Sequence, residues 1–218
     1  MSDTSRSSSD PGRRSDRLLL GAVIVAAVLA AALGYYTWSL LPKDSDTPAT
    51  AFARDLARAD AVVDAAPEAL MPRLRLADVY FKYRDYDTAI DVLEDARSIE
   101  ATAGMRAYLE VGLARVYEAK GDDPSAKDHY ERALEHEQSF DANYALGRMA
   151  RDEGRLGDAM RHWERALELN RSAATLRIEL AKAYADSGRK GSALEQLRTA
   201  REYLPDEPEI ERLLRDLE

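Results

Sequence analysis

The segment LAKAYADSGRKGSALEQLRTA, from Leu180 to Ala200, contains a pattern of small and large residues that the chain carries in four copies. Each copy opens with Leu, a small residue and, three positions later, Tyr or Ala. Twelve residues after the small residue comes Ala, then a large apolar residue four positions on, and a second Ala three positions beyond. Equivalent residues are separated by 37, 33 and 34 positions. The equivalent sets are Leu76, Ala77, Tyr80, Ala89, Leu93 and Ala96; Leu113, Ala114, Tyr117, Ala126, Tyr130 and Ala133; Leu146, Gly147, Ala150, Ala159, Trp163 and Ala166; and Leu180, Ala181, Tyr184, Ala193, Leu197 and Ala200.

Each copy is predicted to be a pair of helices. Both halves of a copy place apolar residues at i, i+3, i+4 and i+7, the pattern of an amphipathic helix. A short polar turn joins the halves, and Gly121, Gly154 and Gly188 stand where a helix should end. A single pair cannot bury its apolar stripe, so neighbouring copies must stack on one another. The sequence therefore predicts an all-α fold, an α-solenoid of about four helix pairs.

This pattern resembles the tetratricopeptide repeat, a 34-residue family with Leu, a small residue and Tyr in its first helix and Ala, an aromatic residue and Ala in its second. The resemblance covers about Leu70 to Pro208. Only the last copy keeps the closing proline, Pro205. The large residue that the family has early in its first helix is absent from every copy and is replaced by Arg73, Glu110, Asn143 and Arg177.

We assign the copies to residues 70–106, 107–139, 140–173 and 174–207 of an array spanning 70–208. Three extra residues around 101–104 should lengthen a helix or widen a turn. A helix over 50–66 precedes the array, and a helix over 209–218, with Ile210, Leu213, Leu214 and Leu217 on one face, should cap its end.

The first 49 residues have a different character. Residues 1–17 are polar and predicted to be a disordered tail, 18–41 contain no charged side chain and predict a transmembrane helix, and 42–49 form a linker. Four arginines precede the span and only Lys43 follows closely, which predicts a cytoplasmic N-terminus and an extracytoplasmic array, as on a bacterial inner membrane facing the periplasm. The alternative is a cleaved signal peptide, with Ala30 and Ala32 at the cleavage site.

Composition narrows the chemistry that the chain can perform. It has no Cys, three His and a net charge of −9. Without clustered Lys and Arg, an acidic chain is a poor nucleic-acid binder. No nucleophile with a neighbouring base, phosphate loop or metal motif is present, so we expect no catalytic residue, no metal, no cofactor and no enzymatic activity. We expect the histidines, His129, His136 and His162, to lie on the surface.

The resemblance implies a concave groove lined by the first helix of each copy. Three of the four residues that follow the small residue are basic, so the groove should carry a basic stripe beside an apolar wall and hold a peptide or protein with acidic groups. The alternative is a solvated face on which Arg148 and Lys182 pair with Asp152 and Asp186, four residues on. The predicted groove residues are Leu74, Asp78, Phe81, Val111, Arg115, Glu118, Tyr144, Arg148, Arg151, Ile178 and Lys182.

Three functions fit these predictions. The first is a membrane-anchored interaction scaffold or adapter in the assembly of an envelope complex. The second is a chaperone-like holdase, since the order of tail, span and repeats resembles that of the bacterial ancillary translocon subunit. The third is a structural tether that self-associates through its span or its repeats, because the segment Ala26 to Ala32 is rich in alanine.

Overall fold

A computed structural model describes residues 48–218, and the predicted tail (1–17), span (18–41) and most of the linker (42–49) lie outside the described residues. The chain divides into two units, 1–51 and 52–218, and nearly all described helices belong to the second. No helix within 48–218 has the length and apolarity needed to cross a membrane. The described helices are α2 (Pro48–Ala65), α3 (Leu70–Lys82), α4 (Tyr86–Ala96), α5 (Ala103–Lys120), α6 (Asp123–His136), α7 (Phe140–Asp152), α8 (Leu156–Leu169), α9 (Ala174–Asp186), α10 (Lys190–Tyr203) and α11 (Pro208–Leu217).

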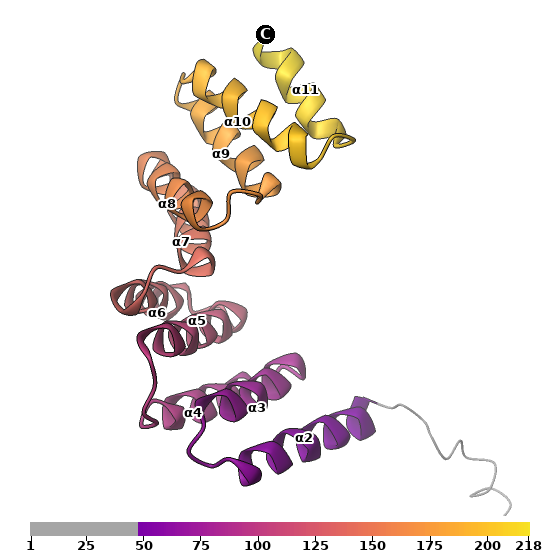
Figure 1. The fold of residues 1–218 in the computed structure, drawn as a ribbon, viewed down its shortest axis with the longest axis vertical. Coiled ribbons are helices and arrows are strands. Elements are labelled where there is room, and N and C mark those ends of the chain that lie inside the picture. Colours follow the sequence, from indigo (N-terminus) through magenta and orange to yellow (C-terminus); the bar gives the residue numbers. More distant parts are fainter. Residues whose placement is uncertain (1–47) are drawn as a thin grey trace, which may run out of the picture. The chain divides into compact units, whose positions relative to one another are not determined.

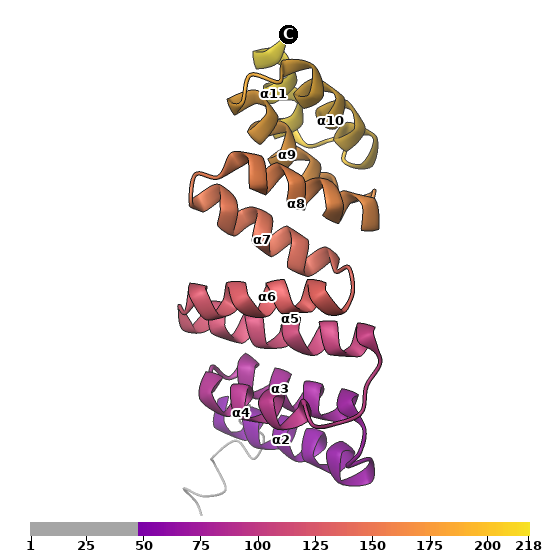
Figure 2. The same ribbon diagram turned by 90° about the vertical axis from the view of Figure 1, so that its left-hand side faces the viewer.

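The helices α3 to α10 pack as four consecutive pairs, α3 with α4, α5 with α6, α7 with α8 and α9 with α10 (Figure 1). The second helix of each pair also contacts the helix that follows it, so α4 meets α5, α6 meets α7 and α8 meets α9. Figure 2 shows the pairs following one another in chain order, with α11 after the last. The described residues contain helices and no strand, which confirms the predicted all-α solenoid.

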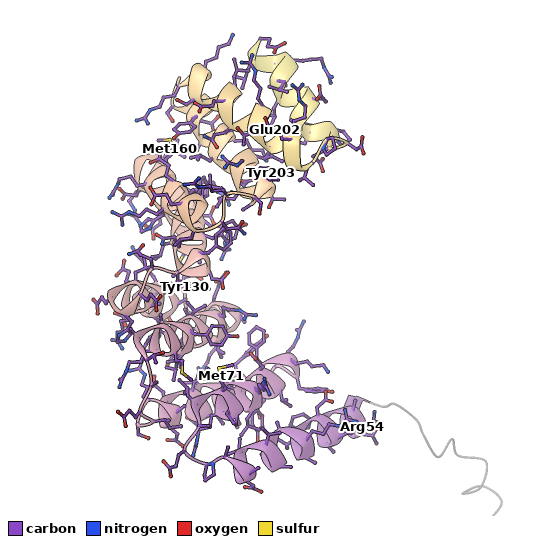
Figure 3. All side chains as sticks on the ribbon, in the orientation of Figure 1. Arg54, Met71, Tyr130, Met160, Glu202 and Tyr203 are labelled. Atoms are coloured by element: carbon purple, nitrogen blue, oxygen red, sulfur yellow. The ribbon has the colours of Figure 1, made fainter. Side chains whose placement is uncertain are left out.

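The repeated residues form the core of each pair. The first Ala of every second helix, from Ala89 to Ala193, has no exposed surface. The large residue one turn later is almost equally buried, and Trp163 is 1% exposed. Tyr130 lies within the α5–α6 pair in the same way (Figure 3). Small residues on one helix and large ones on the other therefore produce close packing, which is the physical reason for their fixed spacing.

The turn inside each pair needs one residue in the left-handed conformation. Gly154 and Gly188 fill it with φ of 76° and 75°, and Gly121 does so with 86°. Glycine has no Cβ to clash there. In the first pair the position belongs to Arg84, with φ of 63°, and among the described residues it alone has a positive φ without being glycine.

The polar residues early in the first helices α5, α7 and α9 form hydrogen bonds to the second helix of their own pair. Glu110 accepts from His129 Nδ1 at 2.8 Å, and Asn143 Oδ1 accepts from His162 Nδ1 at 3.1 Å. Arg177 Nη1 donates to the side chain of Gln196 at 2.7 Å. All three bonds join residues 19 positions apart, and we call them the cross-pair hydrogen bonds.

These bonds correct the expected surface placement of two histidines. His129 is buried and its ring stacks on that of Tyr117 at 5.1 Å between centroids. His162 is half-buried, and only His136 is exposed. The rings of His129 and His162 are hydrogen-bonded to Glu110 and Asn143, the polar residues that stand where the family has a large residue.

The extra residues between the first two pairs both lengthen a helix and widen a turn. The first helix α5 has 18 residues, whereas α3, α7 and α9 have 13. The connection over 97–102 is also longer than the one over 137–139. At the end of the chain, Ile210 and Leu214 of α11 are buried in the core cluster that contains Leu197, so α11 covers the last pair.

Candidate functional site

The predicted groove residues all lie on the first helices, α3, α5, α7 and α9, but their exposure differs. Leu74, Val111 and Ile178, expected as an open apolar wall, are buried in the core. Tyr144, at the equivalent place on α7, is 38% exposed. We call the side of these four helices that carries the predicted residues the first-helix face. Asp78 and Arg115 are exposed on it, whereas Phe81, Glu118, Arg148, Arg151 and Lys182 are half-buried.

Most cations of the predicted basic stripe are bound within the protein. Arg148 of α7 forms an ion pair with Glu118 of α5. Glu118 also accepts a hydrogen bond from Tyr130 at 3.0 Å. Burial alone would lower the pKa of Arg148, but the hydrogen bond and charge of Glu118 raise it. Its charge is therefore compensated before any partner arrives, by a carboxylate of the preceding copy and not by Asp152 on its own helix.

The same arrangement continues toward the C-terminus. Arg151 of α7 pairs with Glu179 of α9 at 2.7 Å, and Lys182 pairs with Glu179 at 2.9 Å. Lys182 also reaches Glu209 of α11 at 3.0 Å. Although burial lowers the pKa of Lys182, its two carboxylate partners raise it. Ion pairs thus connect successive first helices and α11, and they take up the positive charge that an acidic ligand would need.

Arg115 is the exception in this row. Its guanidinium lies over the ring of Phe81, 5.5 Å from the centroid. Within residues 48–218 no carboxylate comes within ion-pairing distance of it. A cation over an aromatic face is held by the ring's quadrupole without losing its charge, so Arg115 stays available for contacts.

A small apolar pocket opens beside Arg115, between α3 and α5. It has a volume of about 30 Å³, enough for the end of one side chain and not for a whole ligand. Five of the eleven predicted groove residues come together here. The lining residues are Leu74, Ala77, Asp78, Phe81, Leu93, Tyr108, Val111, Gly112, Arg115, Val116 and Asp141.

The remaining predicted residues do not join this pocket. Glu118 and Arg148 border a wider and more polar hollow of about 480 Å³ between the α5–α6 turn and α7. Arg151, Ile178 and Lys182 line neither space. The structure thus concentrates the apolar part of the first-helix face in the first two copies.

Tyr108 is a site residue that the sequence analysis missed. It is 48% exposed, and it lines both the pocket and a second hollow of about 220 Å³ on the other side, toward the start of α7. The repeat offered a signal for it, since Tyr108 stands five residues before the repeated Leu113, one turn ahead of Val111. Met71 occupies the same place in the first copy and is exposed too.

Asp78 has an unusual electrostatic environment. The residue as a whole is exposed, yet partial desolvation of its carboxyl group raises the pKa of that group. The positive charge of Arg115 lowers the pKa by less than desolvation raises it. Asp141, from the start of α7, borders the same pocket and is exposed. Both carboxylates have no ion-pair partner within the described part of the chain.

Tandem helix pairs that each contact only their neighbours define an α-solenoid, a class whose extended surfaces serve contacts with other proteins. The tetratricopeptide repeat family model matches residues 150–217. No curated protein sequence matches it.

Solved structures show the same fold at low identity. YrrB, described as a tetratricopeptide repeat protein with an unusual peptide-binding site, is 22% identical, with a TM-score of 0.60 over 73% of this chain and 81% of its own. MamA is 19% identical, with a TM-score of 0.58 over 71% of this chain and 89% of its own. The C-terminal part of a repeat protein from Cytophaga hutchinsonii is 18% identical, with a TM-score of 0.55 over 71% and 60%.

Proposed function

We propose that this protein is a non-enzymatic adapter that binds a segment of a partner protein on its first-helix face, centred on the pocket between α3 and α5. The single observation that carries the proposal is that pocket. It joins an apolar base, an exposed aromatic residue, Tyr108, and a cation, Arg115, that forms no ion pair within the described part of the chain. Of the predicted groove residues outside the pocket, Arg148, Arg151 and Lys182 are already paired with carboxylates. Ile178 is buried, and Tyr144 is exposed but does not line the pocket.

The size of the pocket indicates how a partner would bind. A volume of about 30 Å³ accepts the tip of one apolar side chain. Affinity would then depend on that anchor together with contacts along neighbouring helices, as for an extended segment laid across an array. YrrB, which shares the fold, is described as binding peptides, and this supports a peptide-like ligand here.

The proposal includes a membrane location. Residues 18–41 would anchor the chain, with the N-terminus in the cytoplasm and the repeats outside, where they would serve the assembly of an envelope complex, as in a bacterial inner membrane facing the periplasm. The uncharged composition of 18–41 and the arginines before it support this.

The absence of cysteine from the chain makes the topology directly measurable. A single Cys introduced at exposed Asp206 should react with a membrane-impermeant maleimide in intact spheroplasts. A single Cys introduced at Ser7 should react only after lysis. If Ser7→Cys alone were labelled in intact spheroplasts, the orientation of the chain would be the opposite of the one proposed. If neither variant were labelled, the repeats would lie inside the cell.

The binding site is tested by photocrosslinking from Tyr108. The photoreactive residue p-benzoylphenylalanine replaces Tyr108 in the full-length chain, and adducts formed in cells are identified by mass spectrometry. Gly112→Met should fill the pocket, because Gly112 lines it and a Cβ there meets only Leu93, at the ordinary contact distance of 3.7 Å. Gly112→Ala adds the Cβ alone and is the matched control.

One dominant adduct that disappears in Gly112→Met and persists in Gly112→Ala is expected for an adapter. Many different polypeptides with the same dependence would instead identify a holdase, and crosslinks to the chain itself a self-associating tether. An adduct indifferent to Gly112→Met, or no adduct, would show that the pocket is not the binding site.

A further inference from the structure

The charges around the pocket differ from those that the repeat pattern predicted. Three charged residues line it, and two of them, Asp78 and Asp141, are carboxylates. Arg115 is the third. Asp78 comes from α3 and Asp141 from α7, so the two carboxylates approach the pocket from the helices on either side of α5.

The single cation does not neutralise this pair. Arg115 lies over Phe81, and its charge offsets only part of the desolvation of Asp78, whose pKa stays raised. Asp141 has no cation within ion-pairing distance in the part of the chain that the structure describes. An anion placed against Arg115 would therefore sit beside two carboxylates that repel it, whereas a cation would find them uncompensated.

We propose that the bound segment carries a Lys or Arg next to its apolar anchor, so that this cation meets Asp141 and Asp78 while the anchor enters the pocket. This inference rests on the proposed function and specifies the partner's charge. Neighbouring residues of an extended segment lie about 3.3 Å apart along the chain, so a long basic side chain can reach the rim while its neighbour stays in the pocket. Charge-assisted hydrogen bonds to exposed carboxylates would fix its register.

The inference opposes the acidic ligand suggested by the row of Arg115, Arg148 and Lys182. Arg148 and Lys182 are occupied by Glu118, Glu179 and Glu209, as described above. The charge that a ligand meets at the pocket is then set by Asp78, Arg115 and Asp141, which together carry a net charge of about −1.

The test uses the Tyr108 crosslinker in the full-length chain with charge-neutralising variants. The double variant Asp78→Asn, Asp141→Asn removes both carboxylates and keeps their shape. Arg115→Gln removes the cation. The matched control is Asp91→Asn, Asp95→Asn, which makes the same change at two exposed residues of α4 away from the pocket. Circular dichroism melts check that every variant folds.

We expect the double variant at the pocket to reduce the adduct about tenfold or more, with Arg115→Gln and the α4 control close to wild type. The crosslinked partner peptide should contain Lys or Arg within about three residues of the attachment point. An adduct that survives the double variant overturns the inference, and so does a crosslinked peptide without a basic residue there. An adduct that is absent, or that ignores Gly112→Met, overturns the proposed function as well, which separates the two failures.

Discussion

Single residues fix how closely the helices of a pair approach, and Gly147 is the strictest case. It replaces the Ala found at this place in the other copies, opposite Trp163. A Cβ at Gly147 would come within 2.3 Å of Trp163 Cδ1 and Nε1, and the indole Nε1 donates to the carbonyl of Tyr144 at 3.2 Å. The largest side chain at the packing position therefore requires the smallest residue facing it.

Gly147→Ala should destabilise the protein by about 1–3 kcal/mol, because Trp163 cannot move away without losing its packing and its hydrogen bond. Gly157→Ala, in α8, is the control, since no atom lies within 4 Å of the added Cβ and it should be neutral or stabilising by up to about 1 kcal/mol. Urea denaturation of the full chain measures both. Equal effects of the two substitutions would contradict this account of Gly147.

Arg84 offers the opposite case, a side chain where the other copies have glycine. Its left-handed φ of 63° costs about 1–2 kcal/mol for a residue with a Cβ. Arg84→Gly should raise the free energy of unfolding by about 0.5–1 kcal/mol after the greater entropy of the unfolded glycine is subtracted. The converse, Gly154→Ala, should lower it by a similar amount. A destabilising Arg84→Gly in the same urea titration would show that the arginine makes compensating contacts.

The burial of the repeated small and large residues was predictable from the sequence, because their fixed spacing is explained by close packing between the two helices of a pair. The partners of Arg73, Glu110, Asn143 and Arg177 were not, because the family pattern gives no rule for polar residues there. Glu110 and His129 stand 19 positions apart, as do Asn143 and His162. That shared separation was visible in the sequence, yet only the structure shows that it spans a helix pair.

At the scale of the elements, Glu110 connects three helices. Its carboxylate accepts from His129 of α6 and pairs with Arg97, just after α4, at 3.0 Å. Desolvation by itself would raise the pKa of Glu110, but the hydrogen bond from His129 and the charge of Arg97 lower it below its usual value of 4.5. A carboxylate with a lowered pKa stabilises the fold above its unfolded pKa, and this contribution disappears as the pH falls through the folded pKa.

Glu110→Gln should therefore be less stable than wild type at pH 5, and the difference should shrink as the pH falls toward about 3. Urea midpoints of both proteins across this range measure the effect. A difference that stays constant, or grows, toward pH 3 would mean that the charge of Glu110 is not what stabilises the junction.

The ion pairs between first helices lay beyond prediction for a geometric reason. Arg148 and Glu118 are separated by 30 positions, and Arg151 and Glu179 by 28. Intervals within one helix are fixed by its period, whereas the meeting of side chains from successive pairs depends on how those pairs pack. Ion pairs that remain partly accessible to solvent, as these do, contribute about 1 kcal/mol or less each, so their main effect is on the charge left for ligands.

At the scale of the whole molecule, stability should vary along the array, since each pair contacts only its neighbours. None of the residues Ala49–Ala65 of α2 is fully buried. Helix α2 contacts α3 through Phe52, whose ring lies 6.0 Å from that of Tyr80, and through Asp55, 2.7 Å from Lys82. The Phe52 ring also lies 4.9 Å from that of Tyr83, just after α3. Helix α2 is the least anchored of the described helices.

Hydrogen exchange of the full chain, followed by mass spectrometry, should show the lowest protection in α2 and the highest in α5 to α8, the two pairs that have another helix pair on each side. Phe52→Ala should increase exchange in α2 and leave α7 and α8 unchanged. Protection of α2 equal to that of α6 would contradict a nearest-neighbour array, and so would a loss of protection in α8 on Phe52→Ala.

The cross-pair hydrogen bonds affect which first helix packs against which second helix when the chain folds. Four similar helix pairs in one polypeptide could exchange partners during folding, with the first helix of one copy docking on the second helix of another. The bonds differ from copy to copy, as Glu110 with His129, Asn143 with His162 and Arg177 with Gln196. An exchanged pairing would take Glu110 away from His129 and Asn143 away from His162, so these buried polar groups would lose the partners that they have in their own pairs. The first helices α5, α7 and α9 are thus each matched to their own second helix, and an engineer who transplants one of these three copies must move both helices together.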